Sequence, residues 1–237
     1  MNEKLRCLRN KIRTMDLDGM IVSNPVNIKY LTNIEAEGTL ILARKENYFI
    51  TDGRYIEDVN STLTINDEII VSDVKDISKE DFENFFLFCE NIGFEENYIT
   101  YAKYKEYMYK YRINNFVETE GLIEKQREIK DEEEIKNITK ACIITDKCFD
   151  YITTFIKKGM TEKQIAYEID KFFIENGAEG VAFETIVASG PNSSKPHAVP
   201  TERRITSGDV ITIDMGCKYN GYCSDMTRTI FVDNISD

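Results

Sequence analysis

The sequence predicts an α/β domain at the N-terminus followed by an α+β domain, and three observations support this order. In the first half of the chain, short apolar segments alternate with amphipathic helical patterns, which is typical of α/β folds. In the second half, two helical patterns precede segments rich in β-branched residues. The composition between the halves turns strongly charged from Glu118 to Glu134, so we expect domains over residues 1–120 and 121–237.

The composition of the 237-residue chain argues against several classes of protein. With 30 basic and 42 acidic residues the formal net charge is −12, so we expect no binding to nucleic acid. No apolar run approaches the roughly 20 residues that a membrane span needs, and the N-terminus has no apolar signal core. The six cysteines form no CxxC pair, which favours reduced structural thiols and a cytoplasmic protein.

The first domain should contain short strands between helices. Leu5, Leu8 and Ile12 recur at helical spacing, and Gly19 ends that pattern before a short buried strand. The expected elements are a helix over 5–15, strands over 20–22, 39–43, 48–51 and 69–71, a short helix after 52–55, and a helix over 79–91. The tyrosine-rich tract 98–111 has two interpretations, a recognition surface or an amphipathic helix on the sheet, and we favour the helix.

The second domain should begin with two capped helices. Asp131 with Glu134 predicts the first N-terminus, and Thr161 with Gln164 predicts the second. Glycines at 159 and 177 should end these helices. The expected buried stripe of the first comprises Ile135, Ile138, Cys142, Thr145, Phe149, Ile152 and Ile156, and that of the second comprises Ile165, Ile169, Phe172 and Phe173.

The segments 210–216 and 223–231 predict an antiparallel hairpin with one carboxylate, Asp214 or Asp225, on each arm. A turn centred between Tyr219 and Asn220 places the carboxylates directly opposite, and a two-residue turn at Asn220 and Gly221 makes them diagonal neighbours. Either register leaves both on one face. Two like charges there repel unless a cation or proton lies between them, which makes Asp214 and Asp225 candidate metal ligands. The alternative is that they only mark a strand end and cap a turn.

The lone histidine, His197, lies between Pro196 and Pro200, which restrict the backbone of its loop. It could be a surface residue in a turn, a metal ligand, or a hydrogen-bond donor or proton shuttle beside the carboxylates. We expect Asp209, at the start of the hairpin, to be exposed to solvent and do not count it as a ligand.

Five segments in order resemble motifs of the pita-bread metallopeptidases, in particular aminopeptidase P and prolidase, the Xaa-Pro peptidases. Residues 23–32 and 51–55 resemble signatures of the creatinase-type N-terminal domain, and residues 127–135 resemble the linker and first catalytic-domain helix. Residues 183–200 and 210–229 resemble the substrate loop and the first metal motif. The resemblance covers the whole chain and implies an incomplete pita-bread catalytic domain after the α/β domain.

The resemblance also implies a chemistry. Members of this family hydrolyse the peptide bond before proline, as aminopeptidases or dipeptidases, with two divalent ions: manganese, or alternatively cobalt or zinc. Asp214 and Asp225 match the first two metal ligands. His197 matches a histidine that contacts the substrate and assists the transition state, rather than a ligand. The expected substrate is a small proline-containing peptide, and the complete protein is expected to be a homodimer.

The family's remaining metal ligands, one histidine and two glutamates, come from motifs beyond the first aspartate hairpin, whereas this chain stops at Asp237. We therefore expect roughly the first two thirds of a longer enzyme, inactive without the later ligands. Two alternatives are a non-catalytic protein that binds a peptide or partner on the same scaffold, and a creatinase-like amidinohydrolase.

Overall fold

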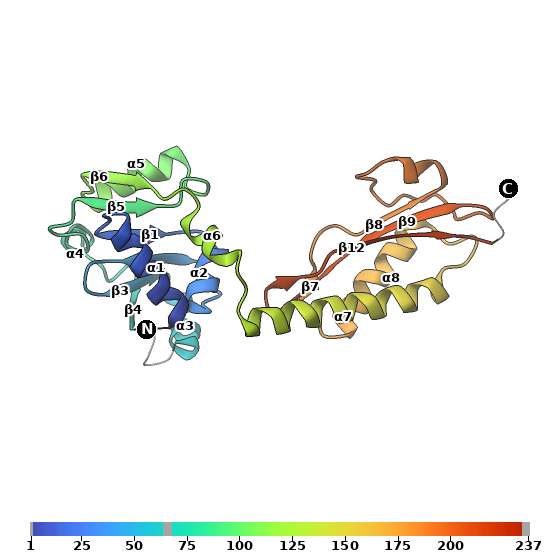
Figure 1. The fold of residues 1–237 in the computed structure, drawn as a ribbon, viewed down its shortest axis with the longest axis horizontal. Coiled ribbons are helices and arrows are strands. Elements are labelled where there is room, and N and C mark those ends of the chain that lie inside the picture. Colours follow the sequence, from blue (N-terminus) through green and yellow to red (C-terminus); the bar gives the residue numbers. More distant parts are fainter. Residues whose placement is uncertain (1, 64–67, 234–237) are drawn as a thin grey trace. The chain divides into compact units, whose positions relative to one another are not determined.

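The computed structural model describes residues 2–63 and 68–233, and the chain divides into two compact units between Ile129 and Lys130 (Figure 1). We call residues up to Ile129 the N-terminal unit and the rest the C-terminal unit. This division differs from the expected boundary at residues 120 and 121 because the short helix α6 (Leu122–Arg127) buries Ile123 in the core of the N-terminal unit. No helix in the described ranges is long and apolar enough to cross a membrane.

The N-terminal unit is built on a six-stranded mixed sheet with the strand order β4-β3-β2-β1-β5-β6. Its strands are β1 (Gly19–Val22), β2 (Gly38–Leu42), β3 (Asn47–Thr51), β4 (Ile69–Asp73), β5 (Asn91–Phe94) and β6 (Asn115–Glu118). Its other helices are α1 (Glu3–Thr14), α2 (Pro25–Thr32), η1 (Gly53–Tyr55), α3 (Ile56–Thr62), α4 (Lys79–Asn84) and α5 (Tyr101–Lys110). The predicted α/β class and the predicted hairpin of β2 and β3 are confirmed.

Helices cover both faces of this sheet, because alternate strand residues point to opposite sides. Met20 and Val22 belong to a core cluster with α1 and α2, whereas Ile21 belongs to a second cluster with α4 and α5. The tyrosine-rich tract forms α5, and it buries Tyr107 and places Tyr111 directly after its end. The helix interpretation of that tract is therefore correct.

The predicted helix over residues 79–91 is too long. Helix α4 ends at Asn84, Phe88 adopts a left-handed backbone with φ of 63°, and Asn91 already begins β5. A bulky residue rarely adopts that conformation, and sequence periodicity does not reveal it. Phe82, Phe86 and Cys89 are nevertheless buried, as expected.

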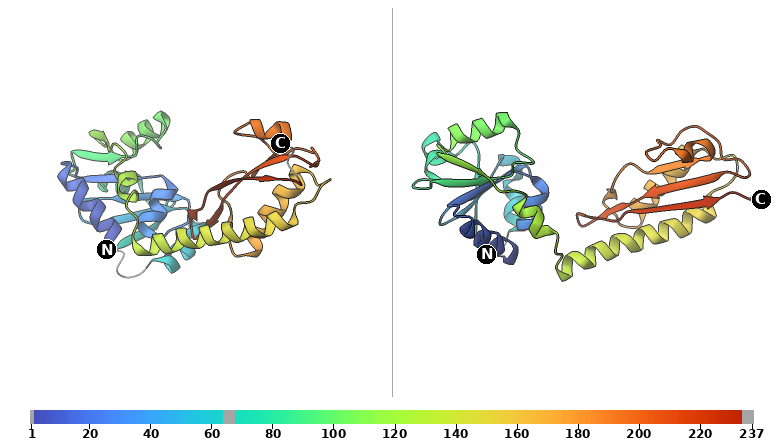
Figure 2. Two further views of the ribbon diagram at one scale, coloured as in Figure 1. Left: turned by 45° about the vertical axis from the view of Figure 1, so that its right-hand side comes forward. Right: turned by 45° about the horizontal axis from the view of Figure 1, so that its top comes forward.

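The C-terminal unit packs a long and a shorter helix against a hairpin that passes through two small sheets. Its helices are α7 (Glu132–Phe155), α8 (Glu162–Glu175) and η3 (Gly190–Ser194). Its strands are β7 (Gly180–Val181), β8 (Ile186–Ser189), β9 (Val210–Met215), β10 (Cys217–Tyr219), β11 (Tyr222–Cys223) and β12 (Met226–Phe231). One sheet has the order β12-β9-β8 and the other β11-β10-β7. Helix α7 runs along one side of the strands (Figures 1 and 2).

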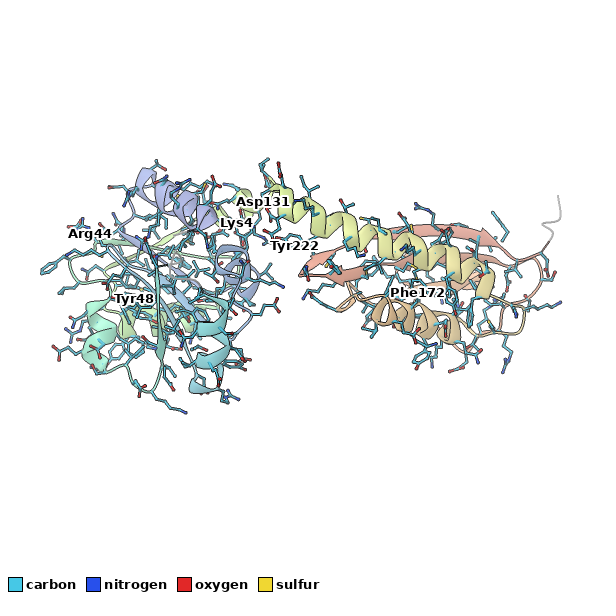
Figure 3. All side chains as sticks on the ribbon, turned by 90° about the horizontal axis from the view of Figure 1, so that it is seen from below. Lys4, Arg44, Tyr48, Asp131, Phe172 and Tyr222 are labelled. Atoms are coloured by element: carbon cyan, nitrogen blue, oxygen red, sulfur yellow. The ribbon has the colours of Figure 1, made fainter. Side chains whose placement is uncertain are left out.

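Both predicted capping boxes are present. The side chain of Asp131 accepts from the backbone N–H of Glu134, and the side chain of Glu134 accepts from the backbone N–H of Asp131. Thr161 and Gln164 do the same at α8. Figure 3 labels Asp131 at the start of α7 and Phe172 on α8.

The predicted buried stripe of α7 is shifted around the helix. Ile135 and Cys142 are exposed, and the buried positions are Glu134, Ala141, Ile144, Thr145, Cys148 and Ile152. Apolar residues occur on more than one face of this helix, so the contacts with the strands determine which face is buried.

A single register runs through the whole hairpin. Tyr219 pairs with Tyr222 around a two-residue turn, and the same register pairs Met215 with Met226 and Asp214 with Thr227. Ser224 fixes this hairpin to α7: its hydroxyl lies 2.6 Å from that of Thr145 and accepts from the backbone N–H of Cys217 at 3.0 Å. Ser224 is buried, so the following residue, Asp225, turns to the opposite face.

Gly216 lies where the opposite arm of the hairpin leaves no room for a side chain. A Cβ atom at this position would lie 2.1 Å from the carbonyl oxygen of Ser224 and 2.9 Å from the ring of Phe183. The Asp-x-Gly sequence at residues 214–216 therefore reflects a steric requirement for glycine next to Asp225.

The expectation that Asp209 is exposed is wrong. Its side chain is buried and forms a two-pronged ion pair with Arg203, with both N–O distances at 2.7 Å. The backbone N–H of Thr206 also donates to this carboxylate. The hydrogen bonds from Arg203, opposed by burial and supported by Thr206, lower the pKa of Asp209 to about 2.

We predict that Gly216→Ala destabilises the protein, because the added methyl group forces the carbonyl of Ser224 away. The expected loss is about 1–3 kcal/mol in the free energy of unfolding, measured by urea denaturation. Thr229→Ala, at an exposed position of β12, is the control and should change stability by less than about 0.5 kcal/mol. An unfolding free energy of Gly216→Ala equal to that of the wild type would contradict the close approach of the Ser224 carbonyl to position 216.

We predict that Asp209→Asn loses less stability in acid than the wild type does. A carboxylate whose pKa is lower in the folded state than in the unfolded state stabilises the folded protein at pH values above the unfolded-state pKa, which is near 4. This stabilisation disappears as the pH falls to about 2, the pKa of Asp209 in the folded state. Between about pH 5 and pH 2, the wild type should lose about 2 kcal/mol more unfolding free energy than Asp209→Asn. The exposed Asp146→Asn control on α7 should follow the wild type, and equal acid sensitivity of all three proteins would refute the role of Asp209.

Candidate metal and substrate site

Asp214 and Asp225 lie on the face of the hairpin that points away from the hydrophobic core. Asp214 is half-buried in β9 and directly opposite Thr227, and Asp225 is exposed two residues before Thr227. Strand alternation therefore puts both aspartates on one face as diagonal neighbours. The Cα atoms of such diagonal neighbours are roughly 7–8 Å apart, and their Cβ atoms are somewhat closer. This spacing is short enough for two carboxylates to share cations.

The apolar neighbours of the aspartates point the other way. Ile211, Ile213 and Met226 pack into the core with α7 and α8, whereas Thr212, Thr227 and Thr229 share the face of Asp214 by the same register. The hydroxyl of Thr227 donates to Oδ1 of Asp214 at 2.7 Å. The candidate site is thus a polar strip on the face of the hairpin opposite the core, with one oxygen of Asp214 already oriented by a neighbour.

The donor chemistry of this face fits a hard divalent cation, because carboxylate oxygens are the ligands that manganese prefers. The number of donors is small. Within residues 2–63 and 68–233, no group of three or more His, Cys, Asp or Glu side chains gathers as a metal site would require. The two aspartates can therefore supply part of a ligand set.

His197 lies in an exposed turn after η3, and no hydrogen bond or ion pair in the described structure joins it to Asp214 or Asp225. Its neighbour Ala198 is buried, so the loop is anchored directly beside the imidazole. In the views of Figures 1 and 2, η3 lies on the side of the strands away from α7.

Sequence reasoning missed a polar network around a buried carboxylate at the ends of the loop that carries His197. Its centre is the carboxylate of Glu162, the first residue of α8, which is fully buried. Burial alone would raise the pKa of this carboxyl, but hydrogen bonds from Thr201 and Ser189 outweigh it and hold the pKa below its ordinary value. Glu162 directly follows the cap residue Thr161, so in the sequence it is indistinguishable from any acidic residue in a first helical turn.

Comparison with known families assigns both units. Residues 4–129 match the creatinase/prolidase N-terminal domain, and residues 136–237 match metallopeptidase family M24. The resemblance inferred from the sequence motifs is therefore confirmed.

Similar proteins support this assignment along the chain. The chain is 36% identical over 237 residues to uncharacterized peptidase YqhT of Bacillus subtilis, covering 99% of this chain and 66% of that protein. It is 31% identical to the Xaa-Pro dipeptidase of Pyrococcus furiosus, covering 98% of this chain and 65% of the relative. The solved Xaa-Pro dipeptidase from Bacillus anthracis superposes with a TM-score of 0.89 at 34% identity, covering 99% and 66% of the two chains.

The chain thus spans about two thirds of the length of these relatives, 65% to 66%. Over that length its fold follows the prolidases, with an α/β unit first and part of the pita-bread fold second. The chain belongs to metallopeptidase family M24 and carries a creatinase/prolidase N-terminal domain.

Proposed function

We propose that Asp214 and Asp225 are two of the ligands of a dinuclear metal centre that hydrolyses the peptide bond before proline. The observation that carries this proposal is the hairpin register, which leaves both carboxylates on one polar face while their apolar neighbours enter the core. Relatives at 31% and 34% identity bear the name Xaa-Pro dipeptidase, which supports proline-containing peptides as substrates. We propose manganese as the metal, with cobalt and zinc as substitutes.

The further ligands of this centre would come from the third of the relatives' length that the chain does not span. Divalent ions bound there would polarise the scissile carbonyl and make water a better nucleophile. The residues of this chain have separate tasks. Asp214 and Asp225 contribute negative oxygen donors, and Thr227 holds Asp214 in one orientation through its hydrogen bond to Oδ1.

His197 is proposed to contact the substrate. An exposed imidazole beside the buried anchor Ala198 is accessible to a peptide and can donate a hydrogen bond to its carbonyl oxygen. Such a bond becomes stronger as negative charge develops on that oxygen, so it would act mainly on the transition state.

We predict that the protein expressed from its complete gene cleaves an Xaa-Pro dipeptide when Mn²⁺ is added, and that Asp225→Asn lowers kcat/KM at least about 100-fold. The loss follows from the removal of a charged ligand oxygen. Proline release should be measured with Ala-Pro, with Ala-Ala as a comparison peptide and creatine as a test of amidinohydrolase activity.

The matched control is Asp146→Asn on the exposed side of α7, which should cleave Ala-Pro at the wild-type rate. Unchanged turnover in Asp225→Asn would refute the ligand role of this residue. Cleavage of creatine in place of Ala-Pro would refute the peptidase assignment, and binding of Ala-Pro without cleavage at any metal concentration would favour a non-catalytic protein.

A further inference from the structure

Glu162 is a buried carboxylate that is stabilised by hydrogen bonds and has no cation within ion-pair distance in the described part of the chain. Five donor groups from three residues point at its two oxygens. The backbone N–H and the hydroxyl of Ser189 both donate to Oε1 at 2.7 Å. The backbone N–H and the hydroxyl of Thr201 donate to Oε2 at 2.9 and 2.5 Å.

The fifth donor is the side-chain amide of Asn192, which lies 3.1 Å from each oxygen. Burying a charged carboxylate costs free energy unless its lone pairs accept hydrogen bonds. The hydrogen bonds to Glu162 therefore hold the three donor residues in fixed positions around it. Loss of Oε1 would leave the two buried donor groups of Ser189 without this acceptor.

These donors lie at both ends of the loop that carries His197 and at one point within it. Ser189 is the last residue of β8, Thr201 follows Pro200, and Asn192 lies in η3 between them. His197 is in the same loop, four residues before Thr201. A single carboxylate thus ties together both ends and an inner point of the loop that presents His197.

The network continues from the loop to the strand of Asp214. The hydroxyl of Ser189 accepts from Arg203 at 2.6 Å, and Arg203 holds Asp209 directly before β9 begins at Val210. A path of hydrogen bonds and one ion pair therefore connects Glu162 with the start of the strand that carries Asp214. Glu162 can fix the loop relative to this strand through the buried residues Ser189 and Asp209 and the partly buried Arg203 between them.

We propose that Glu162 is a positioning residue whose carboxylate sets the conformation of the loop 190–200 and so places the imidazole of His197 for contact with the substrate. This inference rests on the proposed function, in which His197 contacts the substrate. Glu162 does not touch substrate or metal in this account and acts only through the loop.

The central experiment is a double-mutant cycle in the protein expressed from its complete gene, with Ala-Pro as substrate and saturating Mn²⁺. Glu162→Gln replaces one acceptor oxygen by an N–H group that faces existing donors, and it should lower kcat/KM by about 10–100-fold. In the background of His197→Ala, the same substitution should lower kcat/KM less than about threefold, because the imidazole it positions is absent.

Two further variants separate positioning from general destabilisation. Glu162→Asp keeps the charge and both oxygens, so it should retain more activity than Glu162→Gln. Glu168→Gln, on the same helix and hydrogen-bonded to Tyr151, should keep wild-type activity. Mn²⁺ affinity should change less than about threefold in all of these variants. Losses by Glu162→Gln and His197→Ala that multiply, or a parallel loss of Mn²⁺ affinity, would overturn the proposal.

A second measurement does not need activity. His197 is the only histidine, so its ring protons give a single set of NMR signals that report on the loop. Glu162→Gln should shift or broaden these signals in the 237-residue chain without metal, and Glu168→Gln should leave them unchanged. If the wild type cleaves no Xaa-Pro peptide, the proposed function is refuted. The NMR measurement still tests the role of Glu162, because unchanged His197 signals in Glu162→Gln would refute positioning by Glu162.

Discussion

The pairing of Asp214 with Thr227 across β9 and β12 is the constraint on which the candidate site depends. A shift of β12 by one residue would turn Asp225 into the core and expose Met226 and Ile230, which now pack against the core cluster that includes residues of α7 and α8. Burying a carboxylate and exposing two apolar side chains are both unfavourable. The same apolar residues that stabilise the C-terminal unit therefore keep both aspartates on the polar face.

Two buried polar contacts reinforce that register from opposite ends of β9. Near its end, Ser224 bonds to Thr145 on α7 and to the backbone of Cys217, in a place where only glycine fits at position 216. At its beginning, Asp209 is held by Arg203. A change of register that broke either contact would leave a buried polar or charged group without its partner, so both contacts disfavour other registers.

Local signals made much of the fold predictable from the sequence. The capping boxes at Asp131 and Thr161, the turn at Asn220 and Gly221, and the apolar pattern of β9 each depend on residues a few positions apart. The turn left two registers open, and the structure has the diagonal one.

What could not be predicted depends on distant residues. The buried face of α7 is determined by the strands it packs against, and the end of α4 depends on a left-handed Phe88. The burial of Asp209 requires Arg203, and the role of Glu162 requires donors from Ser189 and Thr201, 27 and 39 residues further along the chain. Both acidic residues occupy positions where exposed carboxylates are common, which is why the sequence suggested nothing more.

The most direct test of the account is to locate Mn²⁺ on the 237-residue chain by paramagnetic broadening of amide NMR signals at substoichiometric metal. If Asp214 and Asp225 share a cation, the amide signals of residues 213–215 and 224–227 should broaden first and together, and Asp225→Asn should abolish the broadening on both strands. Broadening that begins elsewhere, for example at the acidic start of α7 (Glu132–Glu134), and that is unchanged in Asp225→Asn would contradict a shared cation site on the hairpin.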